Sequence, residues 1–215
     1  MSHYYWADKK TTQDKEKQQE EPLQPIIVLS PETGGYSEGS PVEVQDNMVM
    51  FYGEVNERNN KTLNKVLRGL DKDLQTVKVK YGVEVPIKLY ISSYGGSIFS
   101  AFSTVDTILT LRTPVHTYID GSAASAATLI SVVAEKRFIH RNSFMLIHQL
   151  SSVMWGKYEE MKDEMENLDL LMERIEEIYR AHCSIPKKEL TEILKHDLWL
   201  DSAKCIKWGL ADEIV

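Results

Sequence analysis

The sequence predicts an α/β fold built around a largely parallel sheet. Short apolar segments alternate along the chain with longer segments whose apolar residues recur every three or four positions. The first pattern is typical of buried strands, and the second is typical of helices that pack one face against a core. A repeated order of strand and helix is typical of parallel sheets, because parallel strands need a crossover connection that is usually helical.

The regular elements begin after a polar amino-terminal segment. Residues 7–24 are almost all polar or charged, which predicts disorder or fraying. A buried strand is expected over 47–53, and leucines and valines at helical spacing over 63–74 predict a helix after it. Valines and a tyrosine then alternate with other residues over 77–85, around Gly82. This alternation predicts a small hairpin or an extended excursion, inserted before the next strand.

The central part of the chain repeats the alternation of strand and helix. Strands are expected over 86–92 and 115–119, and each is followed by a helix. The second of these helices, over about 123–134, is rich in alanine and serine. Two short strands follow at 138–139 and 144–147.

A long helix is expected over about 157–182, and two short helices should start near Ser184 and Asp201. The apolar residues of the long helix alternate in spacing between three and four, at Tyr158, Met161, Met165, Leu168, Met172, Ile175 and Tyr179. Such a stripe suits packing against another long helix. Burial against the core of its own subunit is the alternative.

Composition narrows the class of protein. The chain has 215 residues, enough for one domain with a substantial core, and its net charge of -7 disfavours binding to nucleic acid or anionic lipid. No apolar run approaches the roughly 18 residues that span a bilayer. The first residues lack the apolar region of a secretory signal. The two cysteines are expected to be free thiols in a reducing compartment, so we expect a cytoplasmic protein.

Three polar residues, two of them at the ends of predicted strands, together suggest acyl transfer to water. This chemistry needs a nucleophile, a base, a group that orients the base, and donors for an oxyanion. Ser125 lies between the strand at 115–119 and a helix, where amide groups favour a developing negative charge. His148 closes the strand at 144–147, and Asp197 follows later in the chain. Each residue alone is more often structural, so the hypothesis depends on their combination.

The stretch from Tyr90 to Asp212 resembles the ClpP family of caseinolytic serine peptidases, in which the order along the chain is Ser, His, Asp. The matching segments are YISSYGGSIFSAFSTVDTI, GSAASAA, NSFMLIHQ and HDLWLDSAKCIKWGLADEI. Weaker similarity extends back to about Asp46. The resemblance implies a serine endopeptidase with a catalytic triad of Ser125, His148 and Asp197.

The same resemblance implies further site residues. The backbone amides of Gly96 and Ala126 are expected to form the oxyanion hole, and Ile98 and Leu150 are expected to border the substrate pocket beside Ala126. No metal and no nucleotide cofactor is expected in the peptidase itself.

The family fold is a spiral of β-β-α units, shared with crotonases, that carries a protruding handle. Here the handle would span about 149–182 in a peptidase domain over 46–215, after an amino-terminal segment over 1–45 that is partly disordered or near the axial pore. The expected partners are other copies in a heptameric ring, stacked as two rings, or other ClpP-type subunits in a mixed ring. A hexameric AAA+ unfoldase would deliver unfolded polypeptides to this chamber.

The chain departs from the family pattern at several positions. Tyr94 and Leu150 stand where proline is usual, Ser122 stands where glutamine is usual, and His196 replaces an arginine that commonly precedes the aspartate. The alternatives are a non-catalytic or regulatory ring subunit and, less favoured, a crotonase-like acyl-CoA enzyme. An α/β-hydrolase esterase is disfavoured because the chain lacks G-x-S-x-G and the order Ser, Asp, His.

Overall fold

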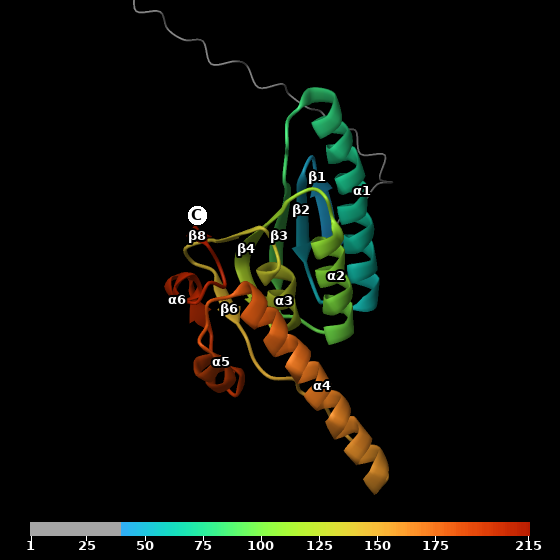
Figure 1. The fold of residues 1–215 in the computed structure, drawn as a ribbon, viewed down its shortest axis with the longest axis vertical. Helices are drawn as coiled ribbons and strands as arrows, with labels where there is room; N and C mark the ends of the chain where they lie inside the picture. The colour runs from blue at the N-terminus through green and yellow to red at the C-terminus, as the bar shows by residue number, and fades with distance from the viewer. Residues whose placement is uncertain (1–39) are drawn as a thin grey trace, which may run out of the picture.

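The computed structural model describes residues 40–215, which form one sheet with helices packed on one face (Figure 1). Its strands are β1 (Val42–Gln45), β2 (Met48–Tyr52), β3 (Ile87–Ser93), β4 (Val115–Ala124), β5 (Lys136–Ile139), β6 (Phe144–Leu146), β7 (Leu200–Asp201) and β8 (Glu213–Ile214). The order across the sheet is β1-β2-β3-β4-β5-β8, while β6 pairs with β4 and β7 pairs with β6. Among the strand pairs of residues 40–215, only β1–β2 and β6–β7 are antiparallel, so the predicted α/β fold with a largely parallel sheet is confirmed.

The amino-terminal segment is described only from residue 40 onward. The disorder predicted over 7–24, and most of the segment 1–45, lie outside the described residues. Residues 42–45 pair with β2 and so form part of the sheet.

The helices connect the strands, and those before residue 135 cover one face of the sheet (Figure 1). They are α1 (Glu57–Tyr81), α2 (Ile98–Thr110), α3 (Ala126–Val132), α4 (Tyr158–His182), α5 (Lys187–Leu194) and α6 (Ser202–Lys207). In β3 the side chains of Ile87, Leu89 and Ile91 are fully buried toward the helices. The opposite face carries aromatic rings, where Tyr118 stacks between Tyr90 and Phe138 at centroid distances of 4.6 and 4.7 Å.

The small hairpin or extended excursion predicted over 77–85 is wrong as far as Tyr81, because α1 continues to that residue, and only residues 83–86 lie outside regular structure before β3. Val77 is buried, on the face that Leu74 also occupies, whereas Val79 is 87% exposed. Alternating valines are typical of strands, but a helix can accept them where every third or fourth residue still meets the core. Gly82, with φ +70, ends α1 and donates its N–H to the carbonyl of Lys78.

Strand β4 is longer than predicted, and α3 correspondingly begins later, at Ala126. The first half of β4 pairs with β5, whereas Ser122 and the two residues after it pair with β6. Gly121, with φ +84, lies at the point where the strand changes partner. A glycine accepts this conformation without the steric cost that a side chain brings, so β4 bends and carries its end toward α3.

Helix α4 confirms the predicted long helix and extends well beyond the rest of the fold (Figure 1). Ile175 and Tyr179, near its inner end, are buried, whereas Tyr158 and Met165 are 67% and 47% exposed. The stripe therefore divides into an inner part in the core and an outer part in solvent. Residues 149–157 lead back to α4 without forming a strand.

Arg137 ties the end of α4 and the carboxyl-terminal residues to β5. Its guanidinium donates from Nε and Nη2 to the Asp212 carboxylate at 3.0 and 2.5 Å, and from Nη1 to the carbonyls of Gly209, at 2.7 Å, and His182. Burial alone would raise the pKa of Asp212, but the hydrogen bonds and charge of Arg137 outweigh it and lower that pKa.

We expect Asp212→Asn to lower the free energy of unfolding by about 1 kcal/mol at pH 7. Because the folded-state pKa of Asp212 is depressed, the carboxylate stabilises the fold fully above its unfolded value of about 3.9. This stabilisation is lost as the pH falls through the lower folded-state value. Urea unfolding at pH 7 and at more acidic pH measures the difference from wild type.

The matched control is Glu213→Gln, because Glu213 is exposed and makes no side-chain hydrogen bond among the described residues. A difference between Asp212→Asn and wild type that stays constant down to acid pH would contradict the assignment.

Candidate active site

Ser125 lies at the junction of β4 and α3 in a strained backbone conformation. Its φ of 54° and ψ of -129° are values that residues with a side chain rarely adopt. The Ser125 N–H donates to the carbonyl of Leu146 in β6 at 2.8 Å. Its carbonyl accepts from the amide of Thr128 at 3.0 Å and from the Thr128 hydroxyl at 2.6 Å. Hydrogen bonds on both sides therefore hold the conformation in place.

Gly95 lies directly against Ser125. A Cβ atom at Gly95 would stand 2.7 Å from the Ser125 Cβ and 2.6 Å from the carbonyl oxygen of Ala124, distances that no side chain tolerates. The φ of Gly95 is +92, which also favours glycine. Gly95 is thus required by its close approach to the serine and not only by a turn.

Gly96 forms a parallel bridge with Val55. Val55 donates its N–H to the carbonyl of Gly95 at 2.9 Å, and the carbonyl of Val55 accepts from Ser97 N–H at 2.7 Å. In such a parallel bridge the residue between the two bonding groups turns its own N–H and C=O away from the partner. The Gly96 N–H therefore faces away from Val55, toward the neighbouring strand β4.

His148 and Asp197 meet although they are far apart in the sequence. Strand β6 pairs antiparallel with β7, and the amide of Gln149 donates to the carbonyl of Leu194 at 2.6 Å. These two contacts bring the segment after β6 alongside the loop between α5 and β7. The His148 Nδ1 atom lies 2.8 Å from Asp197 Oδ1, with side-chain exposures of 25% and 77%.

Ser125 and His148 lie at the same edge of the sheet. Ala124, just before the serine, is the register partner of Leu146, two residues before the histidine. Among the hydrogen bonds of residues 40–215, none joins the Ser125 hydroxyl to His148. Such bonds are commonly long in enzymes without substrate and shorten in the reacting complex.

The predicted pocket residues lie next to these groups in the chain. Ile98 opens α2 two residues after Gly96, and Leu150 follows His148 by two residues. Both side chains are partly buried against the hydrophobic core. Leu150 also donates its amide to the sulfur of Met172 in α4 at 3.2 Å.

Two features near the site were not found from the sequence. A cavity of about 590 Å³ is lined by Ser92, Tyr94, Gly121, Ser122, Phe144 and Trp199. Two of these lining residues contact each other, since the ring of Tyr94 packs edge to face against that of Trp199 with ring centroids 6.3 Å apart. Tyr94 directly precedes the glycine pair. The second feature is the bonding of Thr128 to Ser125, because a threonine inside a helix carries no sequence signal for such a role.

Within the described part of the chain, no group of three or more His, Cys, Asp and Glu side chains is arranged to hold a metal ion. None of the helices there is long and apolar enough to cross a membrane.

The chain is similar in sequence and in fold to known proteins. The chain is 30% identical over 169 residues to the ATP-dependent Clp protease proteolytic subunit 2 of Treponema denticola, covering 77% of this chain and 80% of the relative. It is 29% identical over 135 residues to the corresponding subunit 2 of Treponema pallidum, covering 62% and 68%. A solved ClpP1 mutant from Listeria monocytogenes shares the fold, with a TM-score of 0.69 and 24% identity over 79% of this chain and 91% of that one. The family model described as Clp protease matches residues 43–215, and the chain therefore belongs to the Clp protease family.

Proposed function

We propose that this chain is a serine endopeptidase, the proteolytic subunit of a Clp-type protease, with Ser125 as nucleophile. The observation that carries the proposal is the contact of 2.8 Å between His148 Nδ1 and Asp197 Oδ1, made at the sheet edge where Ser125 lies. Membership of the Clp protease family supports a peptidase and disfavours the crotonase-like alternative.

The geometry supports the mechanism of a serine peptidase. With its Nδ1–H donated to Asp197, the His148 ring presents Nε2 as the base. Nε2 takes the hydroxyl proton as Ser125 Oγ attacks the substrate carbonyl carbon. The tetrahedral intermediate collapses, the C–N bond breaks, and the proton on His148 passes to the leaving amine. Water then attacks the acyl carbon as its proton passes to His148, and the ester C–O bond breaks, which releases the carboxylic acid product and returns the proton to Ser125 Oγ.

The amides of Gly96 and Ala126 are the proposed donors to the oxyanion. Gly96 N–H faces away from Val55, and Ala126 is the first residue of α3, so its N–H has no partner within that helix. Both amides flank the serine, one across the contact of Gly95 with Ser125 and one directly after it. Donors in such positions stabilise charge that develops only in the transition state.

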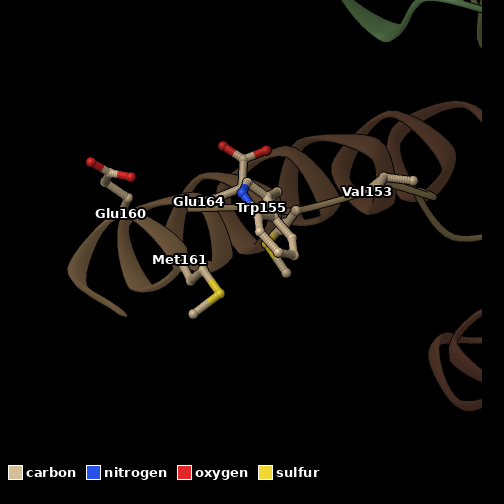
Figure 2. A pocket seen from close by; sticks show the side chains of 6 residues that line it. Val153, Trp155, Glu160, Met161 and Glu164 are labelled. Carbon is tan, nitrogen blue, oxygen red and sulfur yellow. The ribbon is translucent and has the colours of Figure 1, made fainter. Parts of the chain in front are cut away.

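The relatives are named proteolytic subunits of an ATP-dependent protease, and on this ground we propose ring assembly and an ATP-driven unfoldase as partner. The outer part of the handle supports a contact between stacked rings. Trp155 and Val153 are 100% and 98% exposed there. Together with Met161 they line a shallow pocket of about 170 Å³ that also includes Met154, Glu160 and Glu164 (Figure 2). Exposed apolar side chains in such number are typical of an interaction surface.

Ser125→Ala should abolish both peptide cleavage and labelling by a fluorophosphonate probe, since no other group replaces the nucleophile. The expected loss of kcat is at least about a thousandfold. The control is Ser131→Ala in the same helix, which removes a buried hydroxyl bonded to Thr117 but leaves the nucleophile in place. Labelling and cleavage that survive in Ser125→Ala would refute the assignment. A wild type that assembles but is never labelled would favour the non-catalytic ring subunit.

Asp197→Asn should lower kcat by about 10²- to 10⁴-fold with little change in KM, because the amide no longer holds the His148 tautomer. Steady-state kinetics on a fluorogenic peptide measure both constants. Asp201→Asn is the matched control, since Asp201 caps α6 by accepting from Lys204 N–H at 2.8 Å and asparagine caps equally well. Equal kinetics for Asp197→Asn and Asp201→Asn would exclude Asp197 from the triad.

Met165→Glu should separate stacked rings into single rings without unfolding the subunit. Met165 is 47% exposed on the outer part of α4, so a charge there costs little in a free subunit but much in an apolar contact. Sedimentation velocity measures the change, and circular dichroism checks the fold. Val79→Glu, at an 87% exposed position on α1, is the control. A wild type that remains a monomer at all concentrations yet cleaves peptides would contradict the ring assembly.

A further inference from the structure

We propose that Thr128 and Tyr179 are positioning residues for the peptide unit between Ser125 and Ala126, and that they aim the Ala126 N–H at the oxyanion. This inference rests on the proposed function and adds two residues to it. Neither residue touches the substrate in this proposal, and both act through the backbone of the nucleophile.

A buried chain of hydrogen bonds connects α4 to Ser125. The Thr128 hydroxyl donates to the carbonyl of Ser125 at 2.6 Å, and its oxygen lies 2.6 Å from the hydroxyl of Tyr179. A threonine hydroxyl has one proton. Since that proton is donated to Ser125, the proton between the two side chains belongs to Tyr179, which donates to Thr128.

Water has no access to this chain of hydrogen bonds. Thr128 is 0% exposed and Tyr179 is 2% exposed. Burial raises the pKa of the Tyr179 phenol above its ordinary value, so the group keeps the proton that it donates. Each donor polarises the next in such a chain, which strengthens the final bond to the Ser125 carbonyl.

The planarity of the peptide group transmits this contact to the active site. The carbonyl of Ser125 and the N–H of Ala126 belong to one rigid trans peptide, in which the two bonds point in opposite directions. The carbonyl points inward, to Thr128, whose hydroxyl is bonded in turn to Tyr179. The Ala126 N–H therefore points outward, and any rotation of the plane changes its aim.

The positions of both side chains are set independently of the site. Thr128 is fixed by the first turn of α3, whose residues are all buried. Tyr179 lies at the inner end of α4, where Ile175 is also buried and where Arg137 donates to the carbonyl of His182. The strained φ of Ser125 needs such support, because a conformation of this cost persists only when its surroundings hold it.

The proposal predicts a loss in kcat without a matching change in KM. An oxyanion donor interacts with charge that exists in the transition state and not in the bound substrate. Loss of a complete donor typically costs 10²- to 10³-fold, so a misdirected one is expected to cost about tenfold in Thr128→Val. Tyr179→Phe leaves the threonine bond in place, and we expect a loss of about threefold.

Thr128→Val and Thr128→Ser separate positioning from packing. Valine keeps the volume of threonine and removes the hydroxyl, whereas serine keeps the hydroxyl and removes a buried methyl group. We expect Thr128→Val to lose kcat, and Thr128→Ser to lower Tm while kcat stays within about twofold of wild type. The double variant Thr128→Val with Tyr179→Phe should have the kcat of Thr128→Val alone, because Tyr179 acts only through Thr128.

The experiment measures kcat and KM on a fluorogenic peptide, Tm, and the inhibition constant of a peptide aldehyde for the full-length assembled protein. Ser125 Oγ adds to the aldehyde carbon as the serine proton passes to His148, so the former carbonyl oxygen occupies the oxyanion position. The inhibition constant of the aldehyde should therefore rise as kcat/KM falls. Wild-type kcat in Thr128→Val, or a loss in Thr128→Ser that matches that of Thr128→Val, would overturn the inference. Either result leaves the proposed function intact if Ser125→Ala is inactive, whereas an active Ser125→Ala overturns both.

Discussion

The positive φ of Ser125 is the constraint on which the geometry of the site depends. This conformation turns the chain sharply from β4 into α3, so that the serine stands at the sheet edge and the first amide of α3 follows it at once. A conformation of this cost, about 1–3 kcal/mol, needs partners on both sides. Leu146 supplies one by accepting the serine N–H, and Thr128 supplies the other by binding its carbonyl. Gly95 completes the arrangement, since no side chain fits between it and Ser125.

The sheet topology brings the remaining groups to this point. Parallel strands point their carboxyl ends to the same edge, and the ends of β3, β4 and β6 carry the glycine pair, Ser125 and His148 in turn. Asp197 comes from a different part of the chain and reaches His148 because β7 pairs antiparallel with β6. The bend at Gly121 lets β4 pair first with β5 and then with β6. The pairing with β6 brings His148 to the sheet edge beside Ser125, and through β7 it also brings Asp197 to His148.

Helix α4 connects the interior of the subunit with its surroundings. Its inner end belongs to the core, where Tyr179 reaches the helix that carries the nucleophile. Its outer end protrudes from the rest of the fold (Figure 1). Trp155 and other apolar side chains are exposed there, and one subunit alone does not bury them. Residues 149–157 lie partly against the core and partly in solvent, because Leu150 contacts Met172 while Val153 is almost fully exposed. One element thus serves both the proposed assembly and the support of Ser125.

The sequence by itself determined the alternation of strand and helix, the long helix with its stripe, and the order of Ser125, His148 and Asp197, because these depend on local periodicity and on motifs. It did not determine where α1 ends, since the valines around Val79 carry a strand pattern that packing of Leu74 and Val77 overrides. Only the tertiary structure decided the bend of β4, the close contact of Gly95 with Ser125, and the hydrogen bonds from Tyr179 through Thr128. These features join residues distant in the chain, and their energies arise from backbone geometry and burial that exist only once the sheet and helices have packed.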